Sequence, residues 1–474
     1  MEKSGKKSGD LPQVGHELPR IVTPSMGDNS YGPLVAAWAS EHLGFELMPW
    51  QMLVFDGMLE HDADGFLHRN ESLVTVARQN GKTFMFKALL GWWLTEMPKL
   101  AGQPQSVIST AHKLDRAFQV FRELAPILEE KFNAKVSWSY GRNTATMPDG
   151  TLWKVEAATP TNAHGVTADL IVADEVWSIS SDVIFDAYRP TMIARPNPML
   201  AMFSTAGDES STVMMSLREQ ALNAIDNGTE SSLYYAEWSP PPGADLNDPA
   251  SWAWANPALG HTITPKALQR ASETPDRNAF IRAHCNLMVT AASSWLQPGL
   301  WNELETDSEM PSGGVIAVDT DVTDNRYVGV RAAVDGDRRV HVTLAFSVNS
   351  MQQMWAELDK LTGDPTLQVA LTPGLHALAP PALERRLLQF GQREIITYTT
   401  LVRNLIVEGR VTHTGQMQLN EQVNRAVASR NSAGVALSTA KSPGPIEMAR
   451  CMVAAIGFAA KPANSRKPMI GSSA

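Results

Sequence analysis

The sequence has very little cysteine and no long hydrophobic run. Of its 474 residues only Cys285 and Cys451 are cysteines, and neither has a metal-ligand spacing around it. Two distant thiols cannot cross-link a chain of this length, so we expect neither a disulfide framework nor a structural zinc site, and a reducing cytoplasm fits. No window holds about 18 uninterrupted apolar residues, so no transmembrane helix is expected.

The two ends of the chain lack the pattern of a folded segment. The opening letters MEKSGKKSGDLPQ have no apolar core of the kind that a secretory signal needs, and we expect residues 1–29 to form a flexible N-terminal tail. Residues 461–474 are poor in apolar side chains and are expected to be disordered. The whole chain is 43% hydrophobic and 19% charged, an ordinary globular balance, and its length suggests two or three domains.

The chain also lacks an overall positive charge. Its net charge is −10, which by itself argues against nucleic acid as a partner. From Ala382 to the C-terminus, however, 12 Lys and Arg stand against 5 Asp and Glu, a net of +7. Such a region can form a surface that faces DNA, although charge alone is equally compatible with a randomly basic surface.

Strand-like apolar runs alternate with helical patterns between residues 30 and 207. The runs are almost continuously apolar, which is typical of parallel strands buried between helices. We therefore predict an α/β core with a parallel-rich sheet over residues 30–207. The runs that we interpret as strands are 72–78, 105–111, 168–175 and 199–206.

Two further regions follow this core. Residues 208–312 contain a proline-rich loop and short helical stretches near Trp252 and over 267–284, and we predict a small lid or linker subdomain. Residues 313–460 open with an apolar strand and a strand pair turned by Asp335-Gly336-Asp337, which indicates a second α/β domain.

The strongest single motif is V-A-R-Q-N-G-K-T over residues 76–83. It matches the phosphate-binding pattern GxxxxGK[ST], except that Val76 holds the place of the first glycine. A strand before it and a helix after it would let backbone N–H groups surround anionic phosphates. Gly81 allows close approach of the backbone, Lys82 can reach the β- and γ-phosphates, and the Thr83 hydroxyl can bind Mg²⁺. The alternative is a chance GKT at a helix start.

Two acids end the apolar run at residues 170–175. Such a strand delivers carboxylates at its carboxyl end, where Asp174 would complete the Mg²⁺ shell and Glu175 would orient and deprotonate the attacking water. For this run alone, a solvated pair of acids is the alternative. A small polar cluster ends the next run and can sense the γ-phosphate, with a plain turn as the alternative; it comprises Ser204, Thr205, Ala206 and Gly207.

Taken in order, these motifs resemble the large terminase subunits of tailed phages. The likeness spans roughly residues 33–460, and an arginine in a loop without its first glycine is part of the family pattern. The segments that carry it are P-W-Q at 49–51, V-A-R-Q-N-G-K-T at 76–83, H-G-V-T-A-D-L-I-V-A-D-E-V-W at 164–177 and F-S-T-A-G at 203–207.

The resemblance implies roles for individual residues of the ATPase. Trp50 and Gln51 would contact the adenine, with a core aromatic as the alternative for Trp50, and residues 204–207 would couple hydrolysis to movement. Arg189 and Arg195 are candidates for an arginine that acts between subunits, with ordinary surface arginines as the alternative. Catalysis would rest on Glu175, Lys82 and Arg78, and ATP would be bound by Trp50, Gln51, Arg78, Gln79, Asn80, Gly81, Lys82, Thr83 and Asp174.

The resemblance also implies an RNase H-like nuclease domain over residues 313–460. Such a domain uses about three carboxylates to hold two divalent ions, and Mg²⁺ or Mn²⁺ suits an all-oxygen site. The strand 315–319 fits the one that ends in the first acid, Asp319. Glu447 fits the last acid, at the start of a late helix.

The middle acid is absent from its expected place. After the strand 367–371 the family carries Asp, and this chain has Thr372-Pro373. We expect Asp321 to join Asp319 and Glu447 as the third metal ligand. Asp324 is a further candidate, and a solvated turn is the alternative for both.

The sequence thus predicts a DNA-packaging motor: a P-loop ATPase that moves double-stranded DNA into a procapsid, with a nuclease domain that cuts the concatemer. The cofactors would be ATP and Mg²⁺ in the ATPase, and Mg²⁺ or Mn²⁺ in the nuclease. By resemblance, the partners would be DNA, the portal protein, a small terminase subunit and further copies in a ring, in the host cytoplasm. The alternatives are a helicase or translocase without a packaging role and an ATP-binding scaffold.

Overall fold

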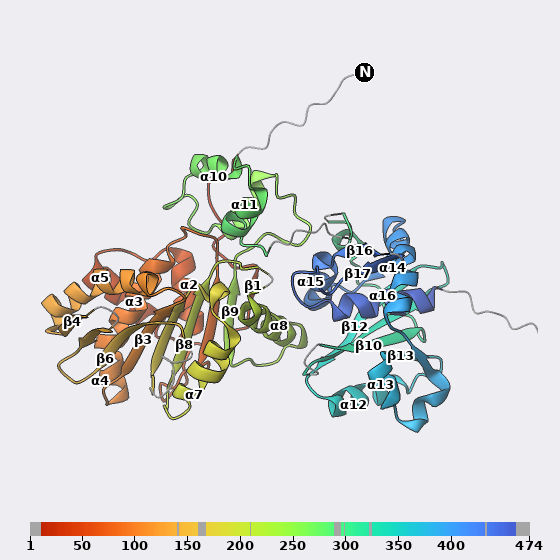
Figure 1. Cartoon of the computed structure of the whole chain (residues 1–474), viewed down its shortest axis with the longest axis horizontal. Coiled ribbons are helices and arrows are strands. Elements are labelled where there is room, and N and C mark those ends of the chain that lie inside the picture. Colours follow the sequence, from red (N-terminus) through yellow and green to blue (C-terminus); the bar gives the residue numbers. More distant parts are fainter. Residues whose placement is uncertain are drawn as a thin grey trace, which may run out of the picture. The chain divides into compact units, whose positions relative to one another are not determined.

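The computed structural model describes residues 11–139, 142–159, 167–208, 210–288, 295–297, 299–321, 325–431 and 434–460. The chain divides into two compact units, the N-terminal unit Met1–Thr290 and the C-terminal unit Ala291–Ala474 (Figure 1). The division falls before residue 313, where the second domain was predicted to begin. Among the described residues, no helix has both the length and the apolar content needed to cross a bilayer.

The described part of the N-terminal unit contains a sheet of nine strands in the order β1-β9-β2-β8-β7-β3-β6-β5-β4. The six strands from β9 to β6 are parallel, whereas β1 and β5 run antiparallel to their neighbours. All four predicted strands are present with nearly the predicted limits. The bounds are β1 Ile21–Val22, β2 Glu71–Thr75, β3 Ser106–Ala111, β4 Lys135–Ser139, β5 Arg142–Thr146, β6 Leu152–Ala157, β7 Leu170–Asp174, β8 Met199–Ser204 and β9 Leu233–Glu237.

Helices cover both faces of this sheet. The crossovers β2-α3-β3 and β8-α8-β9 run in opposite directions along the sheet, and right-handed crossovers therefore place α3 and α8 on opposite faces. The largest core packs α1, α2, α3 and α5 on one face. The bounds are α1 Gly32–Trp38, α2 Pro49–Met58, α3 Lys82–Thr95, α4 Met97–Ala101, α5 Leu114–Phe132, α7 Arg189–Met192 and α8 Thr212–Asn227, with short helical segments η1 Ala39–Leu43, η2 Val176–Ser178 and η3 Asp182–Tyr188.

Residues 11–29 differ from the flexible tail that was expected for 1–29. Ile21 and Val22 form β1, which pairs with β9 at the edge of the sheet. Arg20 Nη2 lies 2.8 Å from Glu237 Oε1, and the Gly15 N–H donates to the Leu259 carbonyl at 2.9 Å. These contacts hold the segment in place because they neutralise a buried carboxylate and complete a sheet edge. Residues 1–10 lie outside the described residues.

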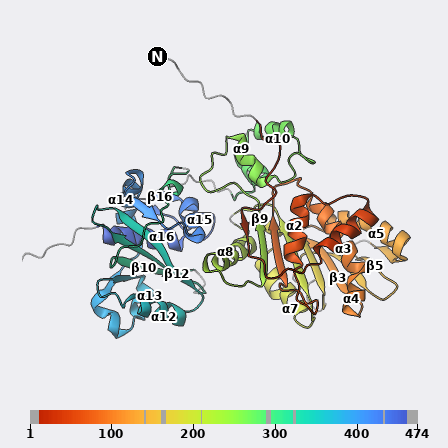
Figure 2. The same ribbon diagram turned by 180° about the vertical axis from the view of Figure 1, so that it is seen from behind.

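The lid subdomain of this unit, residues 249–288, has its own small core of Trp252, Leu268 and Phe280. A side chain caps the start of each of its helices: Asp248 for α9 (Pro249–Trp252), Thr264 for α10 (Pro265–Ser272) and Asp276 for α11 (Arg277–His284). Figures 1 and 2 both show α10 beyond one end of the strands. The lid predicted over 208–312 was too long at its start, because α8 and β9 belong to the sheet layer.

The C-terminal unit has a sheet with the strand order β14-β13-β10-β11-β12-β15. Strands β10, β11 and β12 form an antiparallel meander, whereas β13 and β14 run parallel to β10. This is the strand order of an RNase H-like domain, so the predicted fold class is confirmed. The bounds are β10 Val315–Thr320, β11 Tyr327–Val334, β12 Val340–Val348, β13 Gln368–Leu371, β14 Leu387–Gln389 and β15 Val411–His413, with a separate hairpin of β16 Ala428–Asn431 and β17 Gly434–Leu437.

Helices also cover both faces of the second sheet. The larger core packs α14, α15 and α16 on one face, and the smaller core packs α12 on the other. Helix α16 is almost fully buried, and its small residues allow it to lie close to β10 and β11. The bounds are α12 Met351–Leu361, α13 Pro373–Ala377, α14 Gln392–Val407, α15 Met417–Arg425 and α16 Glu447–Ala459.

Candidate functional site

The phosphate loop, residues 76–83, leaves the carboxyl end of β2 and leads directly into α3. Gln79 and Gly81 have positive φ angles of 66° and 97°. A Cβ atom at Gly81 would also lie 2.9 Å from the Gln51 amide, so glycine is required there for two reasons. Val76 needs no such freedom, because it is buried and its N–H donates to the Ser204 carbonyl of β8 at 3.2 Å. The first glycine of the motif is therefore dispensable in this chain.

Lys82 lies at the centre of the loop. Its Nζ donates to Thr205 Oγ1 at 3.0 Å and to the carbonyl of Val76 at 3.2 Å. Burial lowers the pKa of Lys82 to about 8, although the charges of Asp174 and Glu175 oppose that shift. The ammonium group is thus placed where phosphate oxygens could replace the loop's own carbonyl oxygens.

Asp174 and Glu175 end β7, which is separated from β2 by β8 alone. Asp174 Oδ1 accepts a hydrogen bond from the Glu175 N–H at 2.8 Å. Burial raises the pKa of Asp174 to about 6, and the charge of Lys82 opposes that shift. Glu175 has a φ of 52°, which turns the chain sharply after the strand. The acids and the phosphate loop therefore face the same edge of the sheet.

The cluster Ser204 to Gly207 connects this edge to its surroundings. Ser204 Oγ accepts from the Trp177 N–H at 3.1 Å, just after Glu175. Thr205 Oγ1 donates to the Val76 carbonyl at 3.1 Å. The Ala206 N–H donates to Asn286 Oδ1 at 2.6 Å. A Cβ atom at Gly207 would lie 1.9 Å from Ser211 Oγ, so the last position must be glycine. The cluster thus contacts both halves of the centre and the lid.

Asn286 and Asn256 in the lid were missed from the sequence, and both are buried. Besides Ala206, Asn286 contacts β2 and the end of β9 through Thr75 Oγ1 and the Trp238 carbonyl, each at 2.9 Å. The only signal in the sequence is an asparagine within the apolar stretches W-A-N-P-A-L and H-C-N-L. Such stretches indicate that the asparagine must find partners inside the fold.

Asn256 attaches the lid to the phosphate loop. Its Oδ1 accepts from Asn80 Nδ2 at 3.1 Å, and Asn80 Oδ1 accepts from the Ala258 N–H at 2.9 Å. Two backbone bonds run in parallel, from Ala77 to the Ala255 carbonyl and from Arg78 to the Ala283 carbonyl. A change in the loop's conformation must therefore move the lid or break these bonds.

Trp50 does not have the position that was expected of an adenine contact. Its side chain is fully buried and packs edge-on against Trp238 at 5.2 Å, which is the setting of a core aromatic. Gln51 braces the loop: its Nε2 donates to the Gly81 carbonyl at 3.1 Å, and its Oε1 accepts from the Met48 N–H at 2.8 Å. Arg78 and Gln79 belong to the loop itself, and their side chains are exposed.

Arg189 and Arg195 lie at the opposite end of the sheet. Arg189 pairs with Glu71 at 2.5 Å, and Arg195 pairs with Asp169 at 3.4 Å. Because Glu71 begins β2 and Asp169 precedes β7, both arginines lie by the amino ends of the strands, away from their own phosphate loop. They have the ion pairs of surface arginines, which was the alternative.

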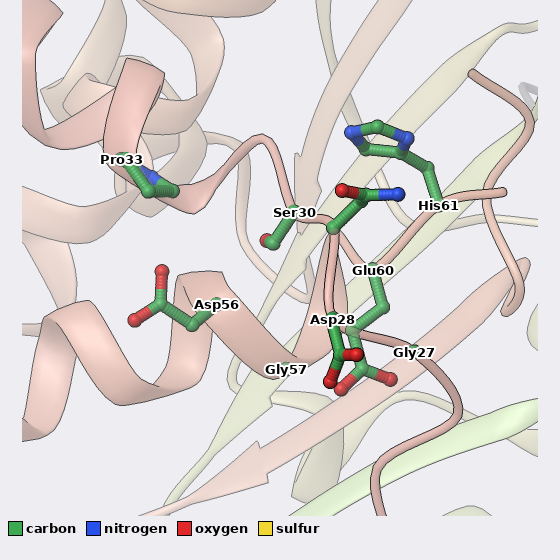
Figure 3. Close-up of a pocket in the computed structure, with 9 residues that line it drawn as sticks. Gly27, Asp28, Ser30, Pro33, Asp56, Gly57, Glu60 and His61 are labelled. Carbon is green, nitrogen blue, oxygen red and sulfur yellow. The ribbon is translucent and has the colours of Figure 1, made fainter. Parts of the chain in front are cut away.

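A separate pocket of roughly 540 Å³ lies between the N-terminal segment and the end of α2 (Figure 3). Its lining includes Asp28, Asp56 and Glu60. Glu60 already has partners, because it accepts from Arg69 Nη1 at 2.8 Å and from the Met26 N–H at 2.9 Å. The pocket therefore belongs to the packing of the N-terminal segment, and we assign no ligand to it.

The second candidate centre lies in the C-terminal unit. Asp319 is buried near the end of β10, where its Oδ1 accepts from the Thr320 N–H at 2.9 Å and its Oδ2 lies 3.7 Å from Arg450 Nε. Burial raises the pKa of Asp319, and Arg450 opposes that shift. Glu447 begins α16 as predicted, and its Oε2 lies 3.2 Å from Arg326 Nη2.

The structure also shows what stands at the position of the missing acid. Leu371 of β13 is the register partner of Val318, so Thr372 follows β13 beside Asp319. Asp321 Oδ1 accepts from the backbone N–H groups of Asn325 and Arg326 at 2.8 and 3.2 Å, which stabilises the turn before β11. Asp324 lies outside the described residues.

The carboxylate oxygens of Asp319 and Glu447 are suitable donors for Mg²⁺ or Mn²⁺. Such an ion would supply activated water for hydrolysis of a phosphodiester. Within the described residues, however, no three Asp, Glu, His or Cys side chains gather as a metal site would require. The donor chemistry fits a divalent ion, and each of the two acids also has an arginine beside it.

Comparisons with known proteins find similarity to one family of proteins. A family model described as the terminase large subunit, endonuclease domain, matches residues 230–353. The large terminase subunit of Enterobacteria phage HK97 is 26% identical over 257 residues, which is 51% of this chain. The chain covers 48% of that relative, or about half of its length.

Solved structures give a likeness over a longer range. The crystal structure of the HK97 bacteriophage large terminase matches with a TM-score of 0.50 and 19% identity, covering 90% of this chain and 100% of that one. The large terminase of a thermophilic bacteriophage matches with a TM-score of 0.36 and 11% identity, covering 91% of this chain and 100% of that one. In its family-model match and in its sequence this chain is similar to the large terminase subunits of phages, and its fold is similar to that of the HK97 large terminase.

Proposed function

We propose that the protein is the ATPase and nuclease subunit of a phage DNA-packaging motor. The observation that carries the proposal is the common edge of the N-terminal sheet, where Lys82 on the phosphate loop faces Asp174 and Glu175. A P-loop ATPase needs this set: backbone donors and a lysine for the phosphates, an acid for the magnesium shell and an acid for the water. ATP and Mg²⁺ are the proposed cofactors.

Each residue of this centre has a proposed task. Gly81, Lys82 and the start of α3 would hold the β- and γ-phosphates, with the exposed side chain of Arg78 beside them. Thr83 and Asp174 would hold the magnesium ion. Glu175 would accept a proton from the attacking water, because it follows Asp174 at a turn and faces the same edge.

The effect of ATP hydrolysis would reach the lid through hydrogen bonds that are already formed. Thr205 contacts both Lys82 and Val76, and Ala206 contacts Asn286 of the lid. Loss of the γ-phosphate would change the contacts of Lys82 and therefore those of Thr205. The lid, which is also bonded to the loop through Asn80 and Asn256, would follow. We propose that this motion moves double-stranded DNA.

The proposed partners follow from the packaging role. Double-stranded DNA would be bound mainly through its phosphates, and binding would therefore weaken with salt. A procapsid portal, a small terminase subunit and further copies in a ring are the proposed protein partners, in the cytoplasm of the host. The C-terminal unit, with Asp319 and Glu447, is the proposed endonuclease that cuts concatemeric DNA.

The ATPase part is tested by steady-state ATP turnover with and without duplex DNA. We expect Lys82→Ala to lower turnover by about 10²–10³-fold, as loss of a charged donor to a transition state does. Lys87→Ala is the matched control, because this lysine lies on the same helix and pairs with Glu123 on the surface. Strand displacement on duplex DNA in the absence of capsids would favour the helicase alternative.

The nuclease part is tested by cleavage of plasmid DNA with Mn²⁺. We expect Asp319→Ala and Glu447→Ala to abolish cutting, and Asp321→Ala to lower it if that acid joins the ion. Asp335→Ala is the control, because Asp335 caps a hairpin turn away from the centre. Unchanged cutting by the Asp319 and Glu447 variants would remove this assignment and leave the ATPase proposal standing.

A further inference from the structure

The nuclease centre contains two arginines that metal-dependent hydrolysis does not require. Arg326 lies just before β11, and Arg450 lies one turn after Glu447 on α16. They form the ion pairs Arg326–Glu447 at 3.2 Å and Arg450–Asp319 at 3.7 Å, and the four side chains expose between 9% and 23% of their surface. Both acids expected to bind metal therefore already have a cationic partner.

The two ion pairs form one cluster. Arg450 and Glu447 share one face of α16, which packs on the strands that carry Asp319 and Arg326. Arg326 precedes Tyr327, which is the register partner of Thr320, so the two ion pairs lie at the same end of β10 and β11. Two carboxylates and two guanidinium groups thus occupy one water-poor space, and their formal charges cancel.

The threonine at position 372, where the family carries an acid, also affects the charge of this cluster. An acid at this position would lie beside Asp319 and would leave the cluster with a net negative charge in spite of the arginines. With threonine there, the ion pairs Asp319–Arg450 and Glu447–Arg326 are each formally neutral. A divalent cation that enters a neutral cluster meets two like charges, whereas the same ion is strongly attracted to two unpaired carboxylates.

We propose that Arg326 and Arg450 are internal counter-ions that keep the nuclease acids closed, so that a divalent cation binds only by displacing them. This inference rests on the proposed nuclease role of the same acids. Arginine suits the task because its guanidinium group stays charged and can bind a carboxylate through two N–H donors. The nuclease is therefore latent until a cation, together with DNA phosphates that can take over the arginines, opens the pairs.

The test measures binding of Mn²⁺ alone to the full chain by titration calorimetry, with no DNA and no nucleotide. We expect Arg326→Gln and Arg450→Gln to bind Mn²⁺ about 10–100-fold more tightly than the parent, because each variant removes a positive charge that repels the ion. The same variants should melt at lower temperature without metal and recover when Mn²⁺ is added. Arg386→Gln is the matched control, because this arginine bonds only backbone carbonyls of Thr362 and Asp364 in the contacts described.

Two further variants separate charge from structure. Arg450→Lys keeps the positive charge and should keep the affinity of the parent. Asp319→Asn combined with Arg450→Gln removes both members of a pair and should show no gain, which would assign the tighter binding to Asp319. If one arginine variant fails to fold, the other carries the test.

Equal or weaker Mn²⁺ affinity in Arg326→Gln and Arg450→Gln would overturn the inference, as would a gain of the same size in Arg386→Gln. Failure of the proposed nuclease role gives a different result. In that case the arginine variants would bind Mn²⁺ more tightly, and neither they nor the parent would cleave DNA.

Discussion

Asp174 in the N-terminal unit and Asp319 in the C-terminal unit have the same local structure and different partners. Each lies at the carboxyl end of a buried apolar strand, and each accepts a hydrogen bond from the next N–H, at 2.8 and 2.9 Å. Burial raises the pKa of both. The local sequence therefore predicts where a carboxylate goes, and the neighbouring elements decide what it can bind.

The cationic partners of Asp174 and Asp319 differ in their surroundings. Asp174 faces Lys82, a cation on a loop whose backbone donors are arranged around a space for phosphate, and Glu175 and Thr205 lie beside the pair. Asp319 faces Arg450 on a packed helix, and Glu447 has its own arginine. One centre has a cation positioned for an anionic ligand, and the other has its charges already matched.

The largest effect that would test this contrast is on catalysis in the first centre. We expect Glu175→Gln to lower ATP turnover by about 10²–10⁴-fold, the usual contribution of a general base, and to leave nucleotide binding and the melting temperature nearly unchanged. Steady-state turnover and fluorescent-nucleotide binding measure this. Glu156→Gln is the control, since Glu156 is also an acid near a strand end and bonds Tyr188. Equal turnover in Glu175→Gln and the parent would leave the scaffold alternative standing.

The next effect concerns the neutral side chains around the first centre. Asn286→Ala leaves the Ala206 N–H, Thr75 Oγ1 and the Trp238 carbonyl without their present partner, and each buried polar group left unsatisfied costs about 1–3 kcal/mol. We expect the N-terminal unit to lose up to roughly 3 kcal/mol in denaturant unfolding, since water can replace some of these bonds. Asn227→Ala, on the exposed end of α8, should change stability little. An equal loss in both variants would contradict a special role for Asn286.

A smaller effect is expected at the second centre. Glu447→Gln removes a charge that faces Arg326 but keeps an oxygen that can accept its hydrogen bond. The pair is also about a tenth exposed. We therefore expect a loss on the order of 1 kcal/mol, confined to the C-terminal unit, with ATP turnover unchanged. Hydrogen exchange of the β10 amides would locate this loss of stability. A loss that appears first in β2 or β7 would contradict the pairing of Glu447 with Arg326.

Much of the fold was predicted from the sequence, because strands and turns depend on local pattern. The four apolar runs became β2, β3, β7 and β8, and the turn at Asp335 joins β11 to β12. The absence of an acid at Thr372 could also be recognised from the sequence, since this position follows a recognisable strand. These features need only the alternation of apolar residues and the residues that end each run.

The parts that were missed depend on contacts between distant segments. Trp50 has the sequence setting of a nucleotide contact and packs on Trp238, almost 190 residues later in the chain. The pairing of Asn80 with Asn256, and of Arg326 with Glu447, likewise joins residues far apart. No periodic pattern in the sequence identifies such partners, because the tertiary fold determines which distant side chains lie beside one another.

The last expected effect concerns an acid near a strand end that, among the described residues, has no arginine or lysine in an ion pair with it. Burial raises the pKa of Glu156 from 4.5 to about 7, and its hydrogen bond from Tyr188 opposes the shift. The folded state therefore binds a proton more tightly than the unfolded chain between these two values, so stability falls as pH rises through that window and the penalty is complete above about 7.

Glu156→Gln removes this loss of stability, because glutamine does not ionise. The variant should melt higher than the parent near pH 8, by an amount that shrinks towards pH 5, whereas exposed Glu123→Gln should show no such trend. A difference that does not vary with pH would mean that Glu156 ionises in the folded protein as easily as in water, and that a strand-end acid needs no cationic partner to keep its charge.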